Sequence, residues 1–400
     1  MNYKKLCDRV NQIEDRITAL AVAGTGMIIG ENDMNEASEL GAELFELSKG
    51  KNELVFSDSG QPNIMVNFDP VPEYQSAALS SDSTLYTPSG YVHPMHIVNG
   101  SVRGIQIGKY NCVRVKGVNY GCSLKGLDCA HSLGFDGFKN LIEGMGNAFA
   151  VNTRANWAFL TLLSLRRGFQ PRGNTLYGRH HSITSERAEA AAQYDASHRI
   201  CRTKTGSGPL TWRTEGSIFR VSDLVGNLYE WLGGYRCYGG KHQVIENNNA
   251  IVNGTDQSAS STLWKEIAQD GSLVAPGTEG TLCYDFPSDP SGNEQAFVIA
   301  GSVEHHSEYY GGVSFASIGV RDGVTIPALA KELLIAPISG NAPTGRAYMR
   351  NGANTERLVI AGGSWASSSN AGLGGLDGDH GRGSGNSAIG ARPARLKPLY

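Results

Sequence analysis

The sequence has no apolar run long enough to cross a membrane, and it is poor in charge. Its 400 residues carry 35 Lys and Arg against 38 Asp and Glu, a formal net charge of -3. A membrane-spanning helix needs about 18 consecutive apolar residues, and the nearest candidate, residues 17–29, is shorter and interrupted by glycine. The charge balance argues against general binding to nucleic acid, which needs a basic surplus. We therefore expect no membrane insertion and no nucleic-acid partner.

Cysteine usage excludes the common cysteine-based metal and redox motifs. The seven cysteines are irregularly spaced, and no two of them stand in a C-x-x-C arrangement. This spacing supports neither a zinc ribbon nor a thioredoxin-type site. We expect free thiols that are buried as small apolar side chains.

Glycine is the residue in excess. The chain has 51 glycines among 400 residues, where an average protein would have about 7%. They follow no collagen-like period, so they predict many turns and close backbone approaches in a loop-rich fold. The hydrophobic fraction of 40% is enough for a substantial core.

The first twenty residues have the most regular apolar spacing. Intervals alternate between three and four residues, at Tyr3, Leu6, Val10, Ile13, Ile17 and Leu20. This seam predicts that residues 1–20 form a short oligomerising coiled coil. The alternative is an amphipathic helix packed on its own domain, which usually shows a wider apolar stripe. The spacing alone leaves dimer and trimer open.

The rest of the chain is predicted to be α+β. Residues 21–95, rich in Ser, Gly, Asp and Pro, are predicted to form a small β-rich segment for attachment or subunit contact. Helices are predicted at residues 35–47, 135–144 and 152–167, and strands at residues 53–56, 63–68, 104–110, 111–116, 206–213, 216–220, 228–233 and 355–363. The strands at 104–110 and 111–116 are expected to form a hairpin. Helices followed by many short strands and long loops are typical of an α+β fold.

Four short patches between residues 92 and 400 form a recognisable pattern. They are Asn152-Thr-Arg-Ala-Asn-Trp157, Pro171-Arg-Gly-Asn-Thr-Leu-Tyr-Gly178, Asp223-Leu-Val-Gly-Asn-Leu-Tyr-Glu-Trp231, and Gly362-Gly-Ser-Trp365 with Ile389-Gly-Ala-Arg392. In this order they resemble the formylglycine-generating-enzyme, or sulfatase-modifying factor, branch of the C-type lectin-like fold. The last two patches are specific as a pair. The resemblance implies one such domain over residues 96–400, with an insert near residues 240–330.

Within that superfamily the chain resembles phage tail receptor-binding proteins. The likeness extends to the targets of diversity-generating retroelements, such as the phage major tropism determinants, and is carried by residues 212–231 and 261–278 and by the leading helix. It implies a virion protein of the phage tail, made in the bacterial cytoplasm. Its partners would be a host cell-surface receptor, either protein or polysaccharide, other phage tail proteins, and further copies of itself in a homo-oligomer, most simply a trimer.

The stretch at residues 366–391 consists almost entirely of Gly, Ser, Ala, Asn and Asp. A flexible linker is one interpretation, but the stretch lies between two framework motifs. A phosphate loop or an EF-hand is another, but the Gly-rich part lacks the P-loop lysine, and Asp377-Gly-Asp379 lacks the further acidic residues of a calcium loop. The third interpretation, which we favour, is a variable ligand-binding stretch within residues 362–395.

The resemblance to retroelement targets implies twelve ligand-contacting positions. In such targets, mutagenesis of asparagine codons at exposed sites produces the residue types found here. The candidates are Ala366, Ser367, Ser369, Gly374, Asp377, Asp379, His380, Gly383, Gly385, Ser387, Ala388 and Ala391. Ala391 replaces an aromatic residue usual in the family, so it is either a variable site or a repacked core position. Arg382, Ile389, Gly390 and Arg392 are expected to be framework.

A surface built from these residues alone would lack the Tyr, Trp and Arg anchors that binding surfaces favour. It would suit a small polar ligand, a weak contact strengthened by avidity, or a backbone contact with a polysaccharide.

An enzyme is a less favoured alternative from a different functional class. Formylglycine-generating enzymes use a cysteine pair in the C-terminal motif, whereas the last cysteine here is Cys283, well before Trp365. A related iron branch uses three histidines, and His180-His181 and His305-His306 are the nearest candidates. Adjacent strand residues point to opposite faces, so each pair supplies one ligand at most, and a zinc-type site needs three or four.

We therefore expect no catalytic residue, no metal ligand and no cofactor, with a structural calcium ion as the one possible addition. Glu230 is the residue for which calcium is considered, and a buried carboxylate bonded by the protein is the favoured interpretation there. A bacterial surface or secreted ligand-binding protein of the same fold and, less favoured, a metal oxygenase remain alternatives.

Overall fold

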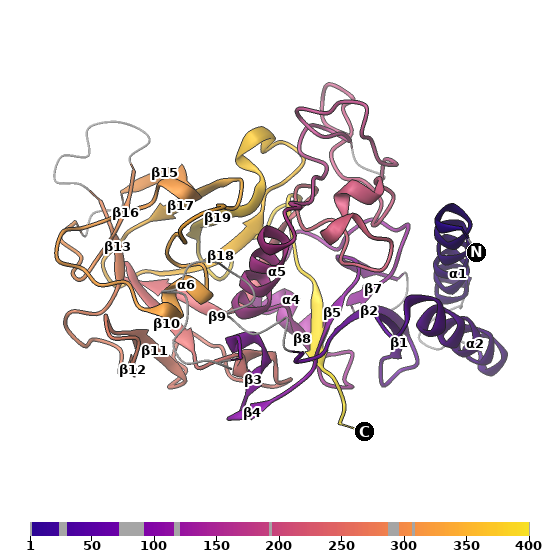
Figure 1. Cartoon of the computed structure of the whole chain (residues 1–400), viewed down its shortest axis with the longest axis horizontal. Helices are drawn as coiled ribbons and strands as arrows, with labels where there is room; N and C mark the ends of the chain where they lie inside the picture. Colours follow the sequence, from indigo (N-terminus) through magenta and orange to yellow (C-terminus); the bar gives the residue numbers. More distant parts are fainter. Residues whose placement is uncertain are drawn as a thin grey trace.

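The computed structural model describes residues 2–23, 30–71, 92–115, 121–191, 194–286, 296–305 and 309–399. These residues form a mixed α and β structure, as predicted, in which two β-sheets hold most of the strands (Figure 1). No helix within these ranges combines the length and apolarity that crossing a membrane requires. All seven cysteines are free thiols, and six of them are buried.

Four of the five helices in the described residues lie close to predicted positions, and the short fifth helix was not predicted. The five are α1 (Tyr3–Ala23), α2 (Glu31–Ser48), α4 (Phe135–Glu143), α5 (Arg154–Arg166) and the short α6 (Ala328–Glu332). The Thr153 side chain caps α5 by accepting a hydrogen bond from the backbone N–H of Asn156 at 3.2 Å. The helix is buried from Arg154 through Leu165, which explains why apolar residues are not confined to one side of it.

The smaller sheet brings strands from the first part of the chain together with a strand from its last residues. Its order is β1 (Asn52–Phe56), β2 (Pro62–Phe68), β5 (Ile105–Gly108), β21 (Pro393–Leu396) and β8 (Phe149–Val151). The strands predicted at residues 53–56 and 63–68 are confirmed as β1 and β2. Because β2 pairs with β5 and β5 pairs with β21, the domain boundary predicted at residue 95 runs through this sheet.

The larger sheet lies on the left in Figure 1. Its main path is β15 (Tyr310–Ser314), β17 (Arg346–Arg350), β19 (Gly372–His380), β18 (Glu356–Gly362), β9 (Tyr229–Tyr238), β10 (Lys241–Ile245), β13 (Cys283–Asp285), β14 (Val298–Ala300) and β16 (Gly319–Val320), with β11 (Trp264–Ile267), β12 (Leu273–Val274) and β20 (Ile389–Gly390) beside it. The predicted strands at 228–233 and 355–363 are confirmed as β9 and β18. Residues 240–330, predicted as an insert, supply the strands from β10 to β16, of which β15 lies at the opposite end of the sheet.

The strands predicted at residues 206–213 and 216–220 are wrong. This part of the chain forms turns and two short 3-10 helices instead. The side chain of Arg213 is buried, and its guanidinium donates to the backbone carbonyls of Gly206 and Ile218 at 3.1 and 3.4 Å. The segment curls around this side chain, a tertiary contact that local sequence does not reveal.

The expected hairpin of residues 104–110 with 111–116 also differs. Strand β5 pairs with β2 and β21, while β6 (Cys112–Arg114) pairs with β7 (Gly121–Ser123). All residues of β5 are buried, so this strand needs a partner on both sides. Residue 116 lies outside the described ranges.

The apolar seam of α1 is buried within the chain itself. Val10, Ile13 and Ile17 have no exposed surface, and they pack in one apolar cluster with Leu44 of α2 and Ile64 of β2. Side chains enclosed in this way cannot also form the core of a coiled coil with another copy. In this structure α1 is an amphipathic helix packed on its own domain, and the predicted coiled coil is not confirmed.

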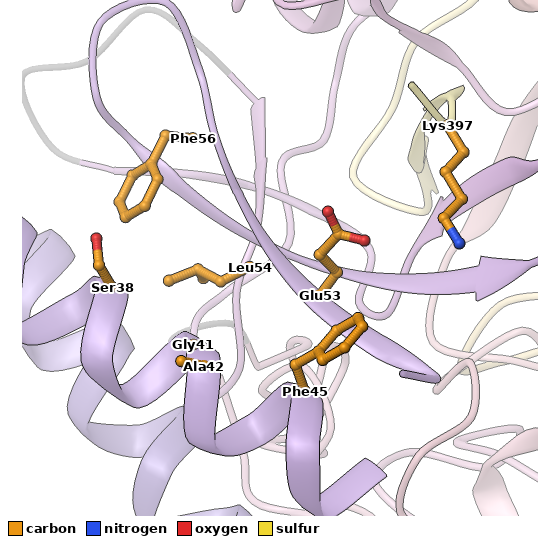
Figure 2. Close-up of a pocket in the computed structure, with 8 residues that line it drawn as sticks. All are labelled: Ser38, Gly41, Ala42, Phe45, Glu53, Leu54, Phe56 and Lys397. Carbon is orange, nitrogen blue, oxygen red and sulfur yellow. The ribbon is translucent and has the colours of Figure 1, made fainter. Parts of the chain in front are cut away.

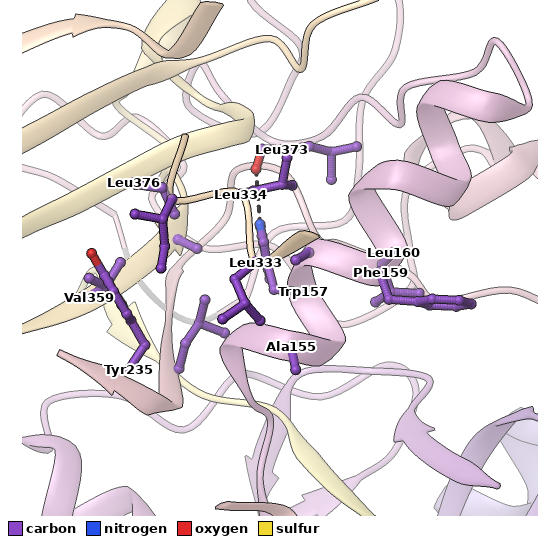
Figure 3. Packing of buried hydrophobic residues seen from close by; sticks show 14 of the residues in the cluster. Ala155, Trp157, Phe159, Leu160, Tyr235, Leu333, Leu334, Val359, Leu373 and Leu376 are labelled. Carbon is purple, nitrogen blue, oxygen red and sulfur yellow. Dashed lines mark hydrogen bonds between the residues drawn. The ribbon is translucent and has the colours of Figure 1, made fainter. Parts of the chain in front are cut away.

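Helix α5 holds the start of β19 in place. Trp157 is fully buried, and its indole N–H donates to the carbonyl oxygen of Leu373 at 2.9 Å (Figure 3). Leu373 and Leu376 are buried in the same apolar cluster. A buried indole N–H without a partner would be costly, so this bond and the surrounding packing fix the position of the strand.

The two glycines of the GGSW motif are required by the backbone. Gly362 and Gly363 have φ angles of 95° and 87°, a region that residues with a Cβ atom rarely adopt. A Cβ atom on Gly362 would also lie 2.4 Å from the carbonyl oxygen of Leu224. The glycines therefore let the chain turn tightly from β18 towards Trp365.

Candidate functional site

A buried ion pair joins the last two sequence motifs, through Glu230 of one and Arg392 of the other. Arg392 binds the carboxylate of Glu230 through two hydrogen bonds of 2.6 and 3.0 Å, and neither side chain has exposed surface. Asn111 donates a third hydrogen bond to Glu230 at 2.8 Å. Burial raises the pKa of Glu230, although the charge of Arg392 opposes this. The carboxylate is thus occupied by protein groups, which was the favoured interpretation for Glu230.

Arg392 also connects this pair to the backbone. Its guanidinium donates to the carbonyls of Gly108 and Ser222 at 3.0 and 2.8 Å. Trp231 and Trp365, the tryptophans of the same two motifs, are both buried. Arg392 therefore connects the end of the candidate stretch to β9 and to the backbone at Gly108 and Ser222.

Part of the glycine-rich stretch, Gly372–His380, forms strand β19. Strand β19 pairs in parallel with β17 and antiparallel with β18, with a register irregularity between Leu358 and Ile360 of β18. A linker interpretation is therefore excluded for these residues. The stretch continues after β19 into a turn that packs near the start of α4, where the Phe135 N–H donates to the carbonyl of Arg382 at 2.9 Å.

The twelve candidate positions fall into three groups by exposure. Exposed are Ala366, Ser369, Gly383 and Gly385, half-buried are Ser367, Asp377, Asp379, His380, Ser387 and Ala388, and buried are Gly374 and Ala391. Gly374 lies against Phe315, and Ala391 belongs to the apolar cluster that also contains Trp231. Neither can contact a ligand as the chain stands, so these two predictions are corrected. Ala391 takes the second of its predicted roles, a repacked core position.

Four of the remaining candidates gather with aromatic and charged residues of neighbouring strands. We call this group the Tyr–Arg surface, and its members are Tyr229, Tyr310, Arg346, Tyr348, Arg350, Ser367, Asp377, Asp379 and His380. Alternation along β17 explains how they come together. Ala347 and Met349 are buried in the core, whereas Arg346, Tyr348 and Arg350 are half-buried on the opposite side of the strand.

Two stacked tyrosines lie at the centre of this surface. The rings of Tyr310 and Tyr348 are stacked, with centroids 5.8 Å apart and planes inclined by 6°. Gly312 lies directly opposite Tyr348 in the β15–β17 register. A Cβ atom on Gly312 would lie 2.4 Å from the Tyr348 ring, so the missing side chain makes room for the ring.

Charged groups surround the two rings. The Arg346 guanidinium lies 5.4 Å from the Tyr348 ring centroid, and that of Arg350 lies 5.0 Å from the Tyr310 centroid, distances at which cations attract aromatic faces. Arg350 also forms an ion pair with Asp379. Arg346 donates to the carbonyl of Gly312 at 2.7 Å. Both arginines are therefore held in place before any ligand arrives.

Asp377 influences the ionisation of its neighbours. Burial, assisted by the negative charge of Asp377, raises the pKa of Tyr229 to about 12, and the same two causes raise the pKa of Tyr310. Burial alone would lower the pKa of His380. Its contact with Asp377, at 3.6 Å between Nε2 and Oδ2, outweighs burial and raises that pKa. The tyrosines remain neutral hydrogen-bonding groups at physiological pH.

Tyr229 connects the Tyr–Arg surface to the other exposed candidates. Its hydroxyl accepts a hydrogen bond from Ser367 Oγ at 3.4 Å, and its backbone N–H donates to the carbonyl of Ala388 at 2.9 Å. The segment around Ser367 and the segment around Ala388 therefore both border this tyrosine.

Sequence reasoning missed five members of this surface: Tyr229, Tyr310, Arg346, Tyr348 and Arg350. The signal was present in β17, where the Arg-Ala-Tyr-Met-Arg run alternates polar and apolar residues as a half-buried strand does. Nothing local places this run next to β19, because the two strands pair in parallel across a long connection. The missing aromatic and arginine anchors are thus supplied by residues before the variable stretch.

The histidine pairs do not assemble a metal centre in the part of the chain described. There, no three His, Cys, Asp or Glu side chains come together in a way that could hold a metal ion. His180 Nδ1 accepts hydrogen bonds from the backbone N–H groups of Ser182 and Ile183, and burial lowers its pKa to about 4. His305 contacts Asp285, which is also paired with Arg321. His306 lies outside the described residues.

A separate apolar groove lies between α2 and β1 (Figure 2). It has a volume of about 510 Å³ and is lined by Ser38, Gly41, Ala42, Phe45, Glu53, Leu54, Phe56 and Lys397. Its walls are mainly apolar, and Phe45 is 40% exposed. The groove contains none of the twelve candidate positions.

Comparison with protein-family models and with curated proteins gives no match for this chain. Among solved structures, the chain is similar to the U1 variant of a major tropism determinant at 11% identity, with a TM-score of 0.31. It is similar to the P3c variant at 12% identity, also with a TM-score of 0.31. In each case the match covers 84% of this chain and 65% of the other, so the chain spans about two thirds of the length of those structures.

Proposed function

We propose that this chain is a receptor-binding protein of a phage tail, which recognises a molecule on the host cell surface without catalysing a reaction. Contact would be made by the Tyr–Arg surface, by the exposed positions Ala366 and Gly383, and by the half-buried Ser387. The scaffold would be the C-type lectin-like fold that the sequence motifs resemble. Assembly as a homotrimer and attachment to other tail proteins belong to the same proposal.

The observation that carries the proposal is the composition of the Tyr–Arg surface. Binding surfaces concentrate their energy in tyrosine, tryptophan and arginine residues surrounded by polar groups. Here Tyr310 and Tyr348 are stacked, and Arg346 and Arg350 lie beside them. These residues border Asp377 and its neighbours on β19, so anchors and candidate variable positions share one face of the sheet.

Rigidity of the scaffold supports the same proposal. A ligand pays less entropy when it binds side chains that are already ordered. The Glu230–Arg392 pair fixes the framework, the Trp157–Leu373 hydrogen bond fixes the start of β19, and the Arg350–Asp379 pair joins β17 to β19. Substitutions at exposed positions could then alter specificity while the scaffold keeps its shape.

Binding of the purified protein to bacterial cells tests the proposal. We expect the fluorescently labelled full-length chain to bind a few strains in a broad panel. Tyr348→Ala should weaken that binding by about tenfold or more, as expected for a central aromatic anchor. Tyr194→Ala is the matched control, because Tyr194 is 52% exposed and lies outside the Tyr–Arg surface. Absence of binding to every strain, or equal loss in both variants, would contradict the proposal.

A further inference from the structure

The arrangement of the Tyr–Arg surface indicates which class of ligand it takes. Its centre is a pair of parallel tyrosine rings, and its border is made of carboxylates and guanidinium groups rather than apolar side chains. A ligand for such a surface must offer a flat, weakly polar face to the rings. It must also offer many hydroxyl-type groups to the border.

We propose that the Tyr–Arg surface binds a saccharide chain, with sugar rings stacked on Tyr310 and Tyr348. This inference rests on the proposed function, since it names the ligand class of the same surface. The C–H face of a pyranose ring would lie on each tyrosine ring. Hydroxyl groups of the sugars would donate to Asp377 and accept from Arg346.

The positions of the charged groups favour a saccharide over a protein partner. The centre of a protein interface is depleted of charged residues because burying them costs desolvation energy. Here Asp377 and Asp379 stand next to the tyrosine rings, and the charge of each contributes to the raised pKa of Tyr310. A protein covering the rings would have to bury these carboxylates, whereas sugar hydroxyls can replace the water around them.

The border groups are also held ready to form hydrogen bonds. Arg350 is paired with Asp379, and Arg346 is bonded to the Gly312 carbonyl. Asp377 accepts a hydrogen bond from the backbone N–H of Asp379 at 2.9 Å. Ordered side chains lose little further entropy on binding, which matters for a sugar because each of its individual contacts is weak.

Selective treatment of the host cells tests the ligand class. A strain that binds the labelled wild-type chain is divided into untreated cells, cells oxidised with periodate, which cleaves vicinal diols of sugars, and cells digested with proteinase K. We expect periodate to abolish binding and proteinase K to leave it. Loss after proteinase K alone would overturn the saccharide inference but leave a protein-binding function standing. Loss after neither treatment would also overturn it.

If both treatments abolish binding, binding of the labelled chain to an array of purified, protein-free bacterial surface polysaccharides is measured. Binding to at least one polysaccharide supports the inference, and binding to none overturns it. If the chain binds no strain at all, the proposed function fails and the saccharide inference fails with it.

Substitutions at Tyr348 test the stacking. Tyr348→Phe keeps the ring face and should retain binding to the polysaccharide within about threefold, whereas Tyr348→Leu should weaken it by about tenfold. Melting temperatures of both variants should lie close to that of the wild type, which separates lost stacking from lost folding. Equal binding by the Phe and Leu variants would overturn the stacking arrangement.

Discussion

Glu14 of α1 and Lys109, which follows β5, form an ion pair of 2.5 Å in which neither side chain has exposed surface. Lys109 also donates to Asn52, and Tyr110 donates to Glu14 at 2.6 Å. Burial alone would raise the pKa of Glu14, but the charges of Lys109 and Arg213 hold it below its usual value. The N-terminal helix is therefore attached to the rest of the chain by a buried polar network as well as by its apolar seam.

Glu14→Gln should destabilise the protein strongly. It leaves the buried charge of Lys109 without its partner, and removing one member of a buried ion pair costs about 3–5 kcal/mol. The midpoint of urea unfolding measures the effect. Glu36→Gln removes an exposed ion pair with Arg16, so the midpoint should hardly move. Similar midpoints for the two variants would show that the Glu14 network contributes little.

Ile13→Ala and Ile17→Ala test how the seam of α1 is used. Both side chains are fully buried within the chain, so each substitution should lower the free energy of unfolding by about 2–5 kcal/mol. The loss should be the same at every protein concentration. A coiled-coil seam would behave differently: the variants would dissociate in light scattering, and stability would depend on concentration.

The glycines of the candidate stretch should differ sharply in their tolerance of side chains. A Cβ atom on Gly383 meets nothing within 4 Å, whereas one on Gly374 or Gly385 lies 2.8 Å from Phe315 or from the backbone of Leu133. Gly383→Arg should therefore keep the wild-type melting temperature. Gly374→Ala and Gly385→Ala should lower it, because overpacking costs about 1–3 kcal/mol. A melting temperature for Gly383→Arg below those of the other two would contradict this ranking.

Buried histidines should make the protein sensitive to acid. Burial lowers the pKa values of His93 and His242 to about 3, whereas an unfolded histidine titrates near about 6.5. Below pH 6.5 the unfolded chain takes up protons that the folded chain cannot, so stability falls as the pH falls. Each histidine should reduce the free energy of unfolding by about 2 kcal/mol between pH 7.5 and pH 5.

Substitutions isolate this effect from other titrations. His93→Gln and His242→Gln should each shrink the difference between unfolding midpoints at pH 7.5 and pH 5. His198→Asn is the control, because His198 is exposed and has a positive φ angle that asparagine tolerates. An unchanged pH difference in the two buried-site variants would contradict the explanation.

Individual helices and strands could be predicted from the sequence better than the way in which they pack against one another. Helices α2, α4 and α5 lie close to their predicted ranges, and the buried Glu230–Arg392 pair lies in the last two of the four motifs that carried the resemblance. The use of the α1 seam could not be predicted, because a short run of this spacing suits packing within one chain as well as between copies. The contacts of α1 with Lys109 and with the smaller sheet show that the seam packs within the chain.

Only part of the candidate site could be predicted, because the rest depends on tertiary contacts between distant segments. The resemblance to retroelement targets implied Asp377, Asp379 and His380, which do lie together on β19. It also selected Gly374 and Ala391, whose burial depends on side chains from distant segments. Tyr310 and Tyr348 were missed because strands β15 and β17 reach β19 only through long-range pairing.

The most direct test compares the Tyr–Arg surface with two other places on the chain. Binding to one positive strain is measured for the double variant Tyr310→Ala, Tyr348→Ala, for Phe45→Ala in the groove between α2 and β1, and for Ala275→Arg, an exposed position on the insert. The account predicts that the double variant loses binding by more than about tenfold while it stays folded, and that the other two bind as the wild type does. Wild-type binding by the double variant, with loss in Phe45→Ala, would contradict the assignment of the Tyr–Arg surface as the receptor-binding site.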